Sequence, residues 1–208
     1  MIKLEKFVTG KLFTNCYILG DTDTKEAFVF DAPAHGAEIY DFVTDKLGFK
    51  IKAVILTHGH FDHILGLDEL VSLSGAPVFM HESEAELVNN KDFNLTSYFR
   101  ADIPHININK KLKDGDILTL GENEIKVIHT PGHTVGGLCF LTGNILLSGD
   151  TLFENSVGKI THMTGDLELE IKSIKEKLMV LPDDILVYPG HGNMTTIGRE
   201  RKENVFLR

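Results

Sequence analysis

Cysteine and long apolar runs are scarce in this chain, and each shortage excludes a class of protein. The 208 residues include two cysteines, Cys16 and Cys139, which lie far apart in the sequence. A disulfide scaffold needs closely spaced cysteines, so the sequence favours a reducing compartment. No apolar stretch approaches the roughly 20 residues that span a membrane, and residues 1–6 lack the apolar core of a signal peptide. We therefore expect a cytoplasmic protein without a membrane segment.

Basic residues are also in short supply, with 21 Lys and Arg against 30 Asp and Glu and a formal net charge of −9. Proteins that bind nucleic acid need a basic surface to neutralise phosphates, so nucleic acid is not an expected partner. A small-molecule substrate, even an anionic one, is compatible with this charge because bound metal cations would attract it. The length fits one domain, and we expect residues 1–208 to form it.

Short apolar segments alternate with turn residues along the chain. Residues 51–56 are nearly all apolar, which is typical of a strand buried on both faces, whereas 36–48 and 166–179 show helical spacing. Residues 89–113 are polar and weakly periodic, so we expect an irregular, substrate-facing segment there. The mixture predicts an α/β protein with packed sheets and outer helices. Further strands are expected at 2–8, 15–20, 26–31, 117–120, 124–129, 137–141, 145–147 and 185–188, and further helices at 65–73 and the C-terminus.

Four metal-binding side chains crowd into six residues directly after the apolar segment 51–56. They are His58, His60, Asp62 and His63. Imidazoles this close would repel one another when protonated and would gain nothing in an apolar core, so a structural role does not explain them. At a strand-to-loop turn, side chains two apart can point the same way. His58 and His60 can therefore face one metal ion while Asp62 and His63 face a neighbouring one.

Three further candidate ligands share one sequence context, since each follows an apolar strand and lies beside a glycine. They are His133 in Thr-Pro-Gly-His-Thr, Asp150 after Ser-Gly, and His191 in Pro-Gly-His-Gly. A lone histidine is more often a surface or core residue than a ligand. The loops after strands, however, are where α/β sheets place their chemistry. Five imidazoles and two carboxylates suffice for two divalent ions that share a bridging oxygen, so the sequence predicts a metal-assisted hydrolase.

These motifs together resemble those of the metallo-β-lactamase-fold hydrolases, and most closely the short, single-domain members of the glyoxalase II (hydroxyacylglutathione hydrolase) branch. The resemblance rests on residues 57–63, 130–134, 149–153 and 189–192, in that order, and covers nearly the whole chain. It implies a four-layer αβ/βα sandwich with the site at one edge of two facing sheets. It also implies two divalent metal ions, with zinc favoured and iron or manganese also suited to these ligands.

The resemblance further implies how the ligands are shared and what they do. It gives the first ion His58, His60 and His133, and the second ion Asp62, His63 and His191, with Asp150 bridging. The implied reaction is hydrolysis of a thioester or ester of the S-lactoylglutathione type. A hydroxide between the two metals would be the nucleophile, and Asp62 and Asp150 would be the catalytic residues that orient it. In agreement, the chain has no Gly-x-Ser-x-Gly motif and no cysteine in a nucleophile motif.

Two alternatives remain open on the same ligands. The superfamily also contains persulfide dioxygenases, which bind one non-haem iron through two histidines and an aspartate, and His58, His133 and Asp150 can form such a set. Oxygen consumption with glutathione persulfide would distinguish this reaction from hydrolysis. The other alternative is a non-catalytic metal-binding domain, although the intact set of seven ligands favours an enzyme.

Three regions are candidates for contact with the substrate. The segment 89–113 is one, and the loop 153–165, with Lys159 and His162, is another. Full-length glyoxalase II holds glutathione with a basic C-terminal helical region. This sequence ends 17 residues after His191, so we expect that region to be missing, which leaves the thiol half of the substrate open. The third region consists of Arg199, Arg201 and Lys202, for which a solvated surface is the alternative.

Overall fold

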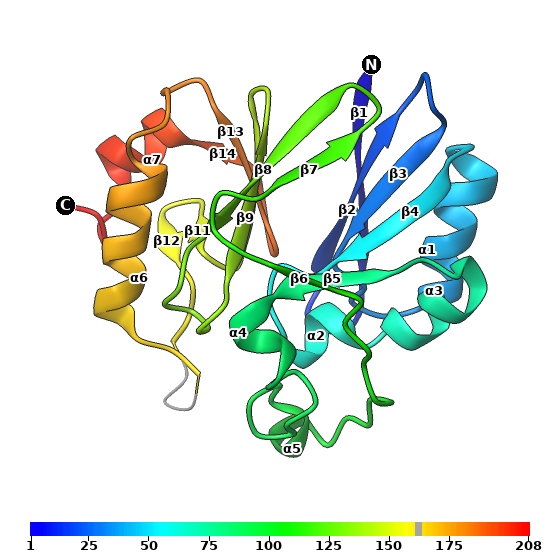
Figure 1. Cartoon of the computed structure of the whole chain (residues 1–208). Coiled ribbons are helices and arrows are strands. Elements are labelled where there is room, and N and C mark those ends of the chain that lie inside the picture. Colours follow the sequence, from blue (N-terminus) through cyan, green and yellow to red (C-terminus); the bar gives the residue numbers. More distant parts are fainter. Residues whose placement is uncertain (161–163) are drawn as a thin grey trace.

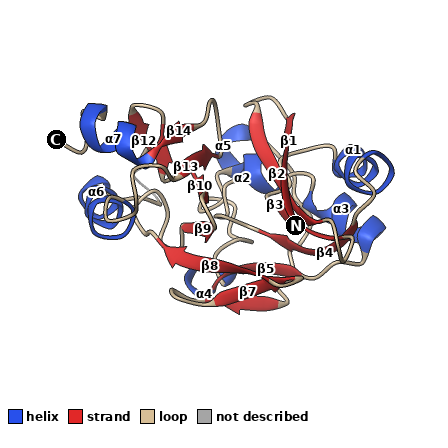
Figure 2. Ribbon diagram, turned by 90° about the horizontal axis from the view of Figure 1, so that it is seen from above, coloured by secondary structure: helices blue, strands red, loops and turns tan. Residues whose placement is uncertain are grey.

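The computed structural model describes residues 1–160 and 164–208 and places two six-stranded sheets face to face. Helices α1 (Gly36–Asp41) and α3 (Leu67–Ser74) cover the outer face of the first sheet. Helices α6 (Leu167–Ser173) and α7 (Ile197–Glu203) cover that of the second (Figures 1 and 2). The layers therefore run helix, sheet, sheet, helix, and the expected αβ/βα sandwich is confirmed.

The two sheets divide the chain roughly into halves. The first has the order β1-β2-β3-β4-β5-β6, the second has the order β14-β13-β10-β9-β8-β7, and β11 and β12 form a separate pair. The strands of the first sheet are β1 (Ile2–Thr9), β2 (Thr14–Asp21), β3 (Glu26–Phe30), β4 (Lys50–Ile55), β5 (Val78–His81) and β6 (Lys110–Leu112). The others are β7 (Ile117–Leu120), β8 (Asn123–His129), β9 (Leu138–Thr142), β10 (Ile145–Gly149), β11 (Leu152–Phe153), β12 (Ser156–Val157), β13 (Leu186–Pro189) and β14 (Thr195–Thr196).

Both faces of the central strands are buried, which explains their continuous apolar sequences. On β2, Cys16 and Ile18 point to the helices, whereas Tyr17 and Leu19 point to the opposite sheet. Strand β3 and residues 53–55 of β4 divide their side chains in the same way because successive residues of a strand face opposite sides. The apolar segment predicted at 51–56 is therefore a strand with two buried faces, as expected for this position between layers.

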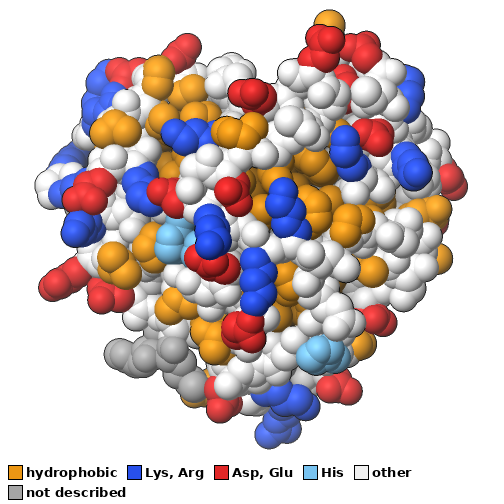
Figure 3. Space-filling view, in the orientation of Figure 1, with side chains coloured by type: hydrophobic (Ala, Val, Ile, Leu, Met, Phe, Trp, Pro, Cys, Tyr) orange, Lys and Arg blue, Asp and Glu red, His pale blue; other side chains and the backbone are white. Residues whose placement is uncertain are grey.

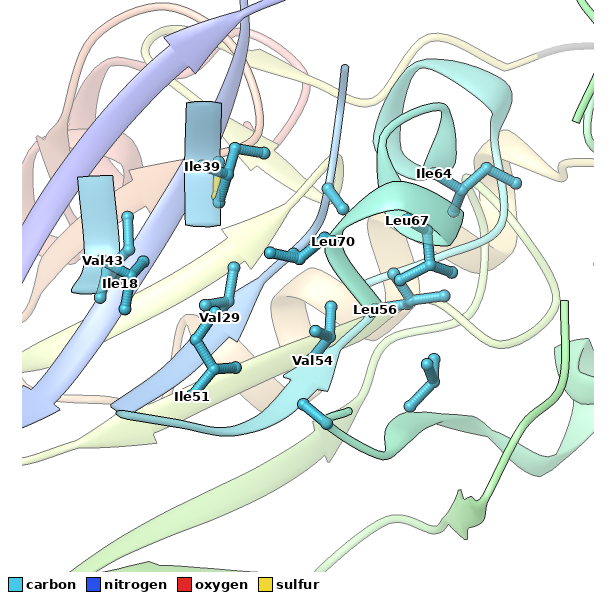
Figure 4. Close-up of a cluster of buried hydrophobic side chains, with 14 of the residues drawn as sticks. Ile18, Val29, Ile39, Val43, Ile51, Val54, Leu56, Ile64, Leu67 and Leu70 are labelled. Atoms are coloured by element: carbon cyan, nitrogen blue, oxygen red, sulfur yellow. The ribbon is translucent and has the colours of Figure 1, made fainter. Parts of the chain in front are cut away.

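Three apolar cores hold the four layers together. The middle core lies between the sheets, where Phe30 and Phe140 pack with their ring centroids 4.9 Å apart. Figure 4 shows the second core, in which Ile39 and Leu70 from the helices meet strand residues such as Val29. The third core lies between the second sheet and its helices, and it contains Cys139, Leu146, Ile174 and Ile197 among others. Cys16 and Cys139 thus lie in different cores as free thiols.

Several short elements differ from the sequence prediction. The predicted helices 36–48 and 166–179 each begin as α-helix and finish as a wider π-helical turn, η1 (Phe42–Lys46) and η2 (Ile174–Leu178). Two further helices, α2 (Phe61–Ile64) and α4 (Glu82–Ala85), were not predicted; along the chain, the first precedes the predicted helix 65–73 and the second follows it. The segment 89–113, expected to be irregular, contains helix α5 (Thr96–Phe99) and strand β6. Elements of three or four residues give only a weak periodic pattern.

The surface and helix lengths agree with part of the compositional argument. In the described part of the chain, no helix is both long and apolar enough to cross a bilayer. Figure 3 shows acidic and basic side chains interspersed over one face of the molecule, with no continuous basic patch there. A basic patch is the usual electrostatic footprint of a nucleic-acid partner, so this face does not indicate one.

Candidate metal centre

The candidate ligands converge because the strands that precede them run in the same direction. Strands β8, β10 and β13 are co-directional, since β9 is antiparallel to both β8 and β10 and β13 is parallel to β10. The loops after them, which carry His133, Asp150 and His191, therefore emerge at one edge of the second sheet. Strand β4 ends at the matching edge of the first sheet and is followed by the cluster that starts at His58. A bridge between Thr14 and His191 joins the two edges.

All seven predicted ligands lie in this one place. The His191 Nε2 atom lies 3.1 Å from Asp62 Oδ2, and His133 Nε2 lies 3.0 Å from His60 Nδ1. The Asp150 carboxylate lies between the histidines, with Oδ1 3.4 Å from His63 Nε2 and Oδ2 3.5 Å from His191 Nε2. Three sets of possible ligand atoms have all members within 4.8 Å of one another, and they are His58–His60–His133, Asp62–His63–His191 and His58–His63–Asp150.

The first two of these sets are the ligand sets that the sequence resemblance implies for the two ions. The third set contains Asp150, the residue expected to bridge them, together with one histidine from each of the other sets. The geometry therefore brings together every residue predicted as a metal ligand. The role of each residue stays a prediction.

Hydrogen bonds from outside the cluster fix how the imidazoles are turned. The outer Nδ1 of His58 contacts Thr57 Oγ1 at 3.0 Å, and that of His63 contacts Asp31 Oδ2 at 2.8 Å. The Nδ1 atoms of His133 and His191 contact the carbonyl oxygens of Lys159 and Leu12, both at 3.1 Å. These four rings therefore present Nε2 to the centre of the site. His60 is turned the other way, with Nε2 3.2 Å from Thr164 Oγ1 and Nδ1 inward.

Three atoms at the centre of the site are buried and lack a hydrogen-bond partner among the described residues. They are His58 Nε2, His63 Nε2 and Asp150 Oδ1. Buried polar atoms are nearly always paired, so an unpaired group of this kind calls for an explanation. Imidazole nitrogen and carboxylate oxygen are ligands for zinc, iron and manganese, and a divalent ion would satisfy all three atoms. The residues present therefore fit a centre that could bind divalent metal ions.

The charges of the cluster suit a cation. Burial, helped by the imidazoles of His63 and His60, lowers the pKa of His58 well below its ordinary value. Burial also lowers the pKa of His60, to about 3. Burial raises the pKa of Asp150, but the imidazoles of His63 and His133 outweigh it and leave that pKa below its ordinary value. Burial lowers the pKa of His63, but the carboxylates of Asp150 and Asp62 outweigh it and leave that pKa well above its ordinary value. At neutral pH His58, His60 and Asp150 are therefore already in the forms that bind metal, whereas a metal ion would displace the proton of His63.

Asp31 is a residue of the site that the sequence reasoning missed. Its side chain is buried, accepts hydrogen bonds from the backbone N–H and the hydroxyl of Thr57, both at 2.8 Å, and contacts His63. Asp31 thus orients one ligand directly and a second, His58, through Thr57. It directly follows β3, as the ligands follow their strands, and that position was the available signal.

A cavity of about 730 Å³ opens above the cluster. Its lining includes Lys159, which was predicted as a candidate for substrate contact, and Leu95 and Phe99, which belong to the segment 89–113. The prediction for His162 lies outside the described residues. The cavity is lined by Leu12, His60, Phe61, Asp62, Leu95, Phe99, His133, Asp150, Phe153, Glu154, Ser156, Val157, Lys159, His191, Gly192 and Asn193.

The three basic residues near the C-terminus are not among the described residues that line this cavity. Arg199 instead pairs with Glu154 at 2.6 Å and with Glu203 at 3.1 Å. Arg201 donates to the carbonyl oxygens of Met179 and Leu181, and Lys202 is exposed. A solvated surface is therefore the better description of these three residues. The two guanidinium groups bind neighbouring protein groups, and Lys202 is exposed to solvent.

Comparisons with known proteins agree with this arrangement. The family model described as "Metallo-beta-lactamase superfamily" matches residues 9–191. The chain is 34% identical to "Hydroxyacylglutathione hydrolase GloC" of Haemophilus influenzae over 93% of this chain and 92% of that protein. It is 32% identical to "Probable metallo-hydrolase YqgX" of Bacillus subtilis over 99% of this chain and 98% of that protein.

Solved structures show the same fold. The BLEG-1 B3 metallo-beta-lactamase superposes with a TM-score of 0.92 and 32% identity, covering 99% of both chains. TTHA1623, in a di-iron-bound form, superposes with a TM-score of 0.86 and 28% identity, covering 98% of this chain and 100% of that protein. ETHE1 from Myxococcus xanthus superposes with a TM-score of 0.82 and 25% identity, covering 98% of this chain and 83% of that protein. With a family model matched over most of its length and a site of the expected composition, the chain belongs to the metallo-beta-lactamase superfamily.

Proposed function

We propose that this protein is a metal-dependent hydrolase that cleaves a thioester or ester. One observation carries the proposal: seven imidazole and carboxylate groups converge below an open cavity, and three of their inward atoms are buried and unpaired. The proposed ligands are His58, His60 and His133 for one ion, and Asp62, His63 and His191 for the other, with Asp150 between them. Divalent ions held there would supply acidification of water and polarisation of the substrate carbonyl.

The two carboxylates of the proposed site, Asp62 and Asp150, orient the attacking water in this proposal. Burial raises the pKa of Asp62, but the imidazoles of His63 and His191 outweigh it, so the carboxylate is ionised and accepts hydrogen bonds. Its Oδ2 already accepts one from Thr14 Oγ1 at 3.1 Å, which fixes the plane of the group. Asp150 is ionised for the same reason and faces the same space. A thiolate leaves without needing a proton, so a thioester requires no further general acid.

The walls of the site suit a substrate with two halves. Phe61 and Phe99 stack with their ring centroids 4.2 Å apart and separate the main cavity from a second cavity of about 630 Å³. Leu12 and Asp62 also border both cavities, so a scissile bond held near Asp62 can extend a group into each. A thioester has this two-armed form, and similarity to the Haemophilus influenzae hydroxyacylglutathione hydrolase supports S-lactoylglutathione as the first substrate to test.

The test combines metal content with turnover. Purified protein loaded with zinc should bind two ions and hydrolyse S-lactoylglutathione or another member of a panel of thioesters, esters and a β-lactam. Asp62→Asn should lose the second ion and lower kcat on the order of 100-fold, because a ligand and an orienting carboxylate are removed together. Asp68→Asn, an exposed change on α3, is the matched control and should leave both values unchanged. Wild-type protein that binds no zinc would contradict the proposal.

The third set of ligand atoms favours one second candidate, an iron-dependent oxidation. His58, His63 and Asp150 provide two histidines and one carboxylate, the set typical of non-haem iron oxygenases. This set differs from the predicted one in containing His63 in place of His133. Similarity to the di-iron-bound form of TTHA1623 supports iron as a metal to load. Oxygen uptake by the iron-loaded protein with glutathione persulfide, without hydrolysis of any ester, would favour this second function. Absence of both activities in the fully loaded protein would favour a binding domain.

A further inference from the structure

Glu84 on helix α4 is a fully buried carboxyl group that the proposed reaction does not use. Glu84 is 0% exposed. Its Oε1 accepts a short hydrogen bond from the hydroxyl of Thr134 and another from the backbone N–H of Gly136 at 2.9 Å. Removing a carboxyl group from water costs free energy, so a fully buried one needs a compensating role. Both hydrogen-bond partners of Glu84 lie in the loop of residues 134–136, far from α4 in the sequence.

The other oxygen of Glu84 faces the loop that carries the histidine cluster. A Cβ atom added to Gly59 would lie 3.2 Å from Oε2, so the carboxyl group packs directly on the backbone between His58 and His60. A Cβ atom added to Gly136 would lie 2.7 Å from the Glu84 side chain. Both loops therefore approach this carboxyl group with glycine, and neither leaves room for a side chain between the loop and Glu84.

Glu84 thus lies between two loops that are far apart in sequence, and these loops supply the three histidines of one ligand set. His58 and His60 flank Gly59, and His133 precedes Thr134. We propose that Glu84 is a positioning residue that sets the spacing of His58, His60 and His133 and so tunes the affinity of this one metal site. The inference rests on the proposed metal centre and deepens it, because it predicts that the two sites depend differently on a single carboxyl group.

Another buried carboxylate provides a matched control. Glu200 on α7 is also 0% exposed, and it accepts hydrogen bonds from Asn155 N at 2.8 Å and Thr195 Oγ1 at 2.6 Å. These hydrogen bonds join helix α7 to the turn between β11 and β12 and to strand β14, and they do not involve the loops of His58 or His133. Removing Glu200 should cost stability as removing Glu84 does, but without a preference for one metal site.

The experiment measures the occupancy of each site separately. Crystals of wild type, Glu84→Ala, Glu84→Gln and Glu200→Ala are grown at limiting zinc, and the anomalous signal gives the occupancy at both sites. A chelator competition in solution gives the two affinities. Glu84→Ala should weaken zinc at the His58–His60–His133 site by roughly 10- to 100-fold, the usual loss when a partner that orients a ligand is removed. The Asp62–His63–His191 site should keep its wild-type affinity.

Glu84→Gln keeps one oxygen for Thr134 and Gly136 but turns an amide N–H₂ toward Gly59, so its loss should be intermediate and confined to the same site. This variant replaces the alanine variant if the latter does not fold. Equal occupancy of both sites in the Glu84 variants, or a loss shared by Glu200→Ala, overturns the inference while the metal centre stands. Wild-type protein without zinc at either site would overturn both.

Discussion

At the scale of single residues, hydrogen bonds from outside the cluster hold the candidate ligands in their orientations. Asp31 accepts hydrogen bonds from Thr57 and lies 2.8 Å from His63 Nδ1. Because both neighbours point donors at the carboxylate, it holds two imidazoles in the orientation that presents Nε2 inward. Partners of this kind fix the tautomer of a ligand histidine and raise its basicity.

Asp31→Asn should therefore weaken zinc binding without removing a ligand. The amide would place an N–H₂ group against the donors of Thr57 or His63, and we expect a roughly 10- to 100-fold loss of affinity. A competition titration with a coloured chelator measures the change. Asp45→Asn, an exposed position in η1, is the matched control. Wild-type affinity in Asp31→Asn would show that the carboxylate does not orient the ligands.

Glu170 provides a prediction for pH. Burial, with a smaller contribution from the charge of Asp150, raises its pKa to about 8 against the hydrogen bond from the Gly158 N–H. The folded protein then holds a proton that the unfolded chain releases, so this contribution to stability is lost as pH rises from the ordinary carboxyl value toward 8. Without metal, the Glu170→Gln variant should lose less stability than wild type between pH 5 and pH 8. Urea unfolding at both pH values measures the difference, and parallel changes in the two proteins would refute the assignment.

The sequence could predict the seven candidate ligands but not the residues proposed to orient them. Metal coordination restricts a position to a few residue types, and His58 to His63 concentrate those types in one motif. Asp31 and Glu84 act through hydrogen bonds to the backbone and to hydroxyl groups, which impose no spacing in the sequence. Their roles became visible once Thr57 and Thr134 were located in three dimensions.

At the scale of elements, the short helix α5 contributes more to the site than its length suggests. The side chain of Asn94 accepts hydrogen bonds from both the N–H and the hydroxyl of Thr96, which fixes the start of the helix. This places Phe99 against Phe61, where the two rings separate the two cavities. The segment predicted to face the substrate does line the cavity, although through a helix rather than an irregular loop.

Phe99→Ala should therefore affect substrate binding and spare the metals. Removing the ring merges the two cavities and deletes an apolar wall, and we expect KM to rise on the order of 10-fold for substrates with an apolar arm. Steady-state kinetics and zinc content measure the two effects. Tyr98→Ala removes an exposed ring next to it that does not line either cavity, and it should leave KM unchanged. A fall in zinc content with unchanged KM would contradict this role of Phe99.

The longer strands were the more readily predicted from the sequence. Strands β2, β3, β4 and β8 have five to eight residues and were expected within one or two residues of their observed bounds. Strands β7 and β13 have four residues each and were predicted as well, whereas β5, β11 and β14, which have four residues or fewer, were not, because so few residues give only a weak periodic signal. They form because neighbouring strands already present unpaired backbone groups, which is a property of the assembled sheet.

At the scale of the whole molecule, metal binding and stability should be coupled. The proposed ligands come from loops that follow strands of both sheets, so an unfolded chain cannot hold the same site. A metal that binds only the folded state at 100 times its Kd adds about 2.7 kcal/mol to the free energy of unfolding. Urea unfolding with saturating zinc and with excess chelator measures this difference. Calcium, which prefers oxygen ligands, should not replace zinc, and identical curves with and without zinc would contradict the coupling.

The layered architecture could be predicted from the sequence, but the pairing that closes it could not. Alternation of strand and helix segments indicates sheets with outer helices. The parallel pairing of β10 with β13 and the bridge from Thr14 to His191 join segments that are remote in the chain. Such contacts leave no local pattern, since they depend on which strands lie next to one another after folding.

The bridge between Thr14 and His191 also bears on how the protein is made. His191 lies near the end of the chain and is held against a strand near its beginning, so the Asp62–His63–His191 set is incomplete while the ribosome is still translating β13. Domains that depend on pairings this distant complete their structure late. Cation loading at the proposed centre would therefore follow the synthesis of β13, and a nascent polypeptide that lacks His191 would not hold the full proposed ligand set.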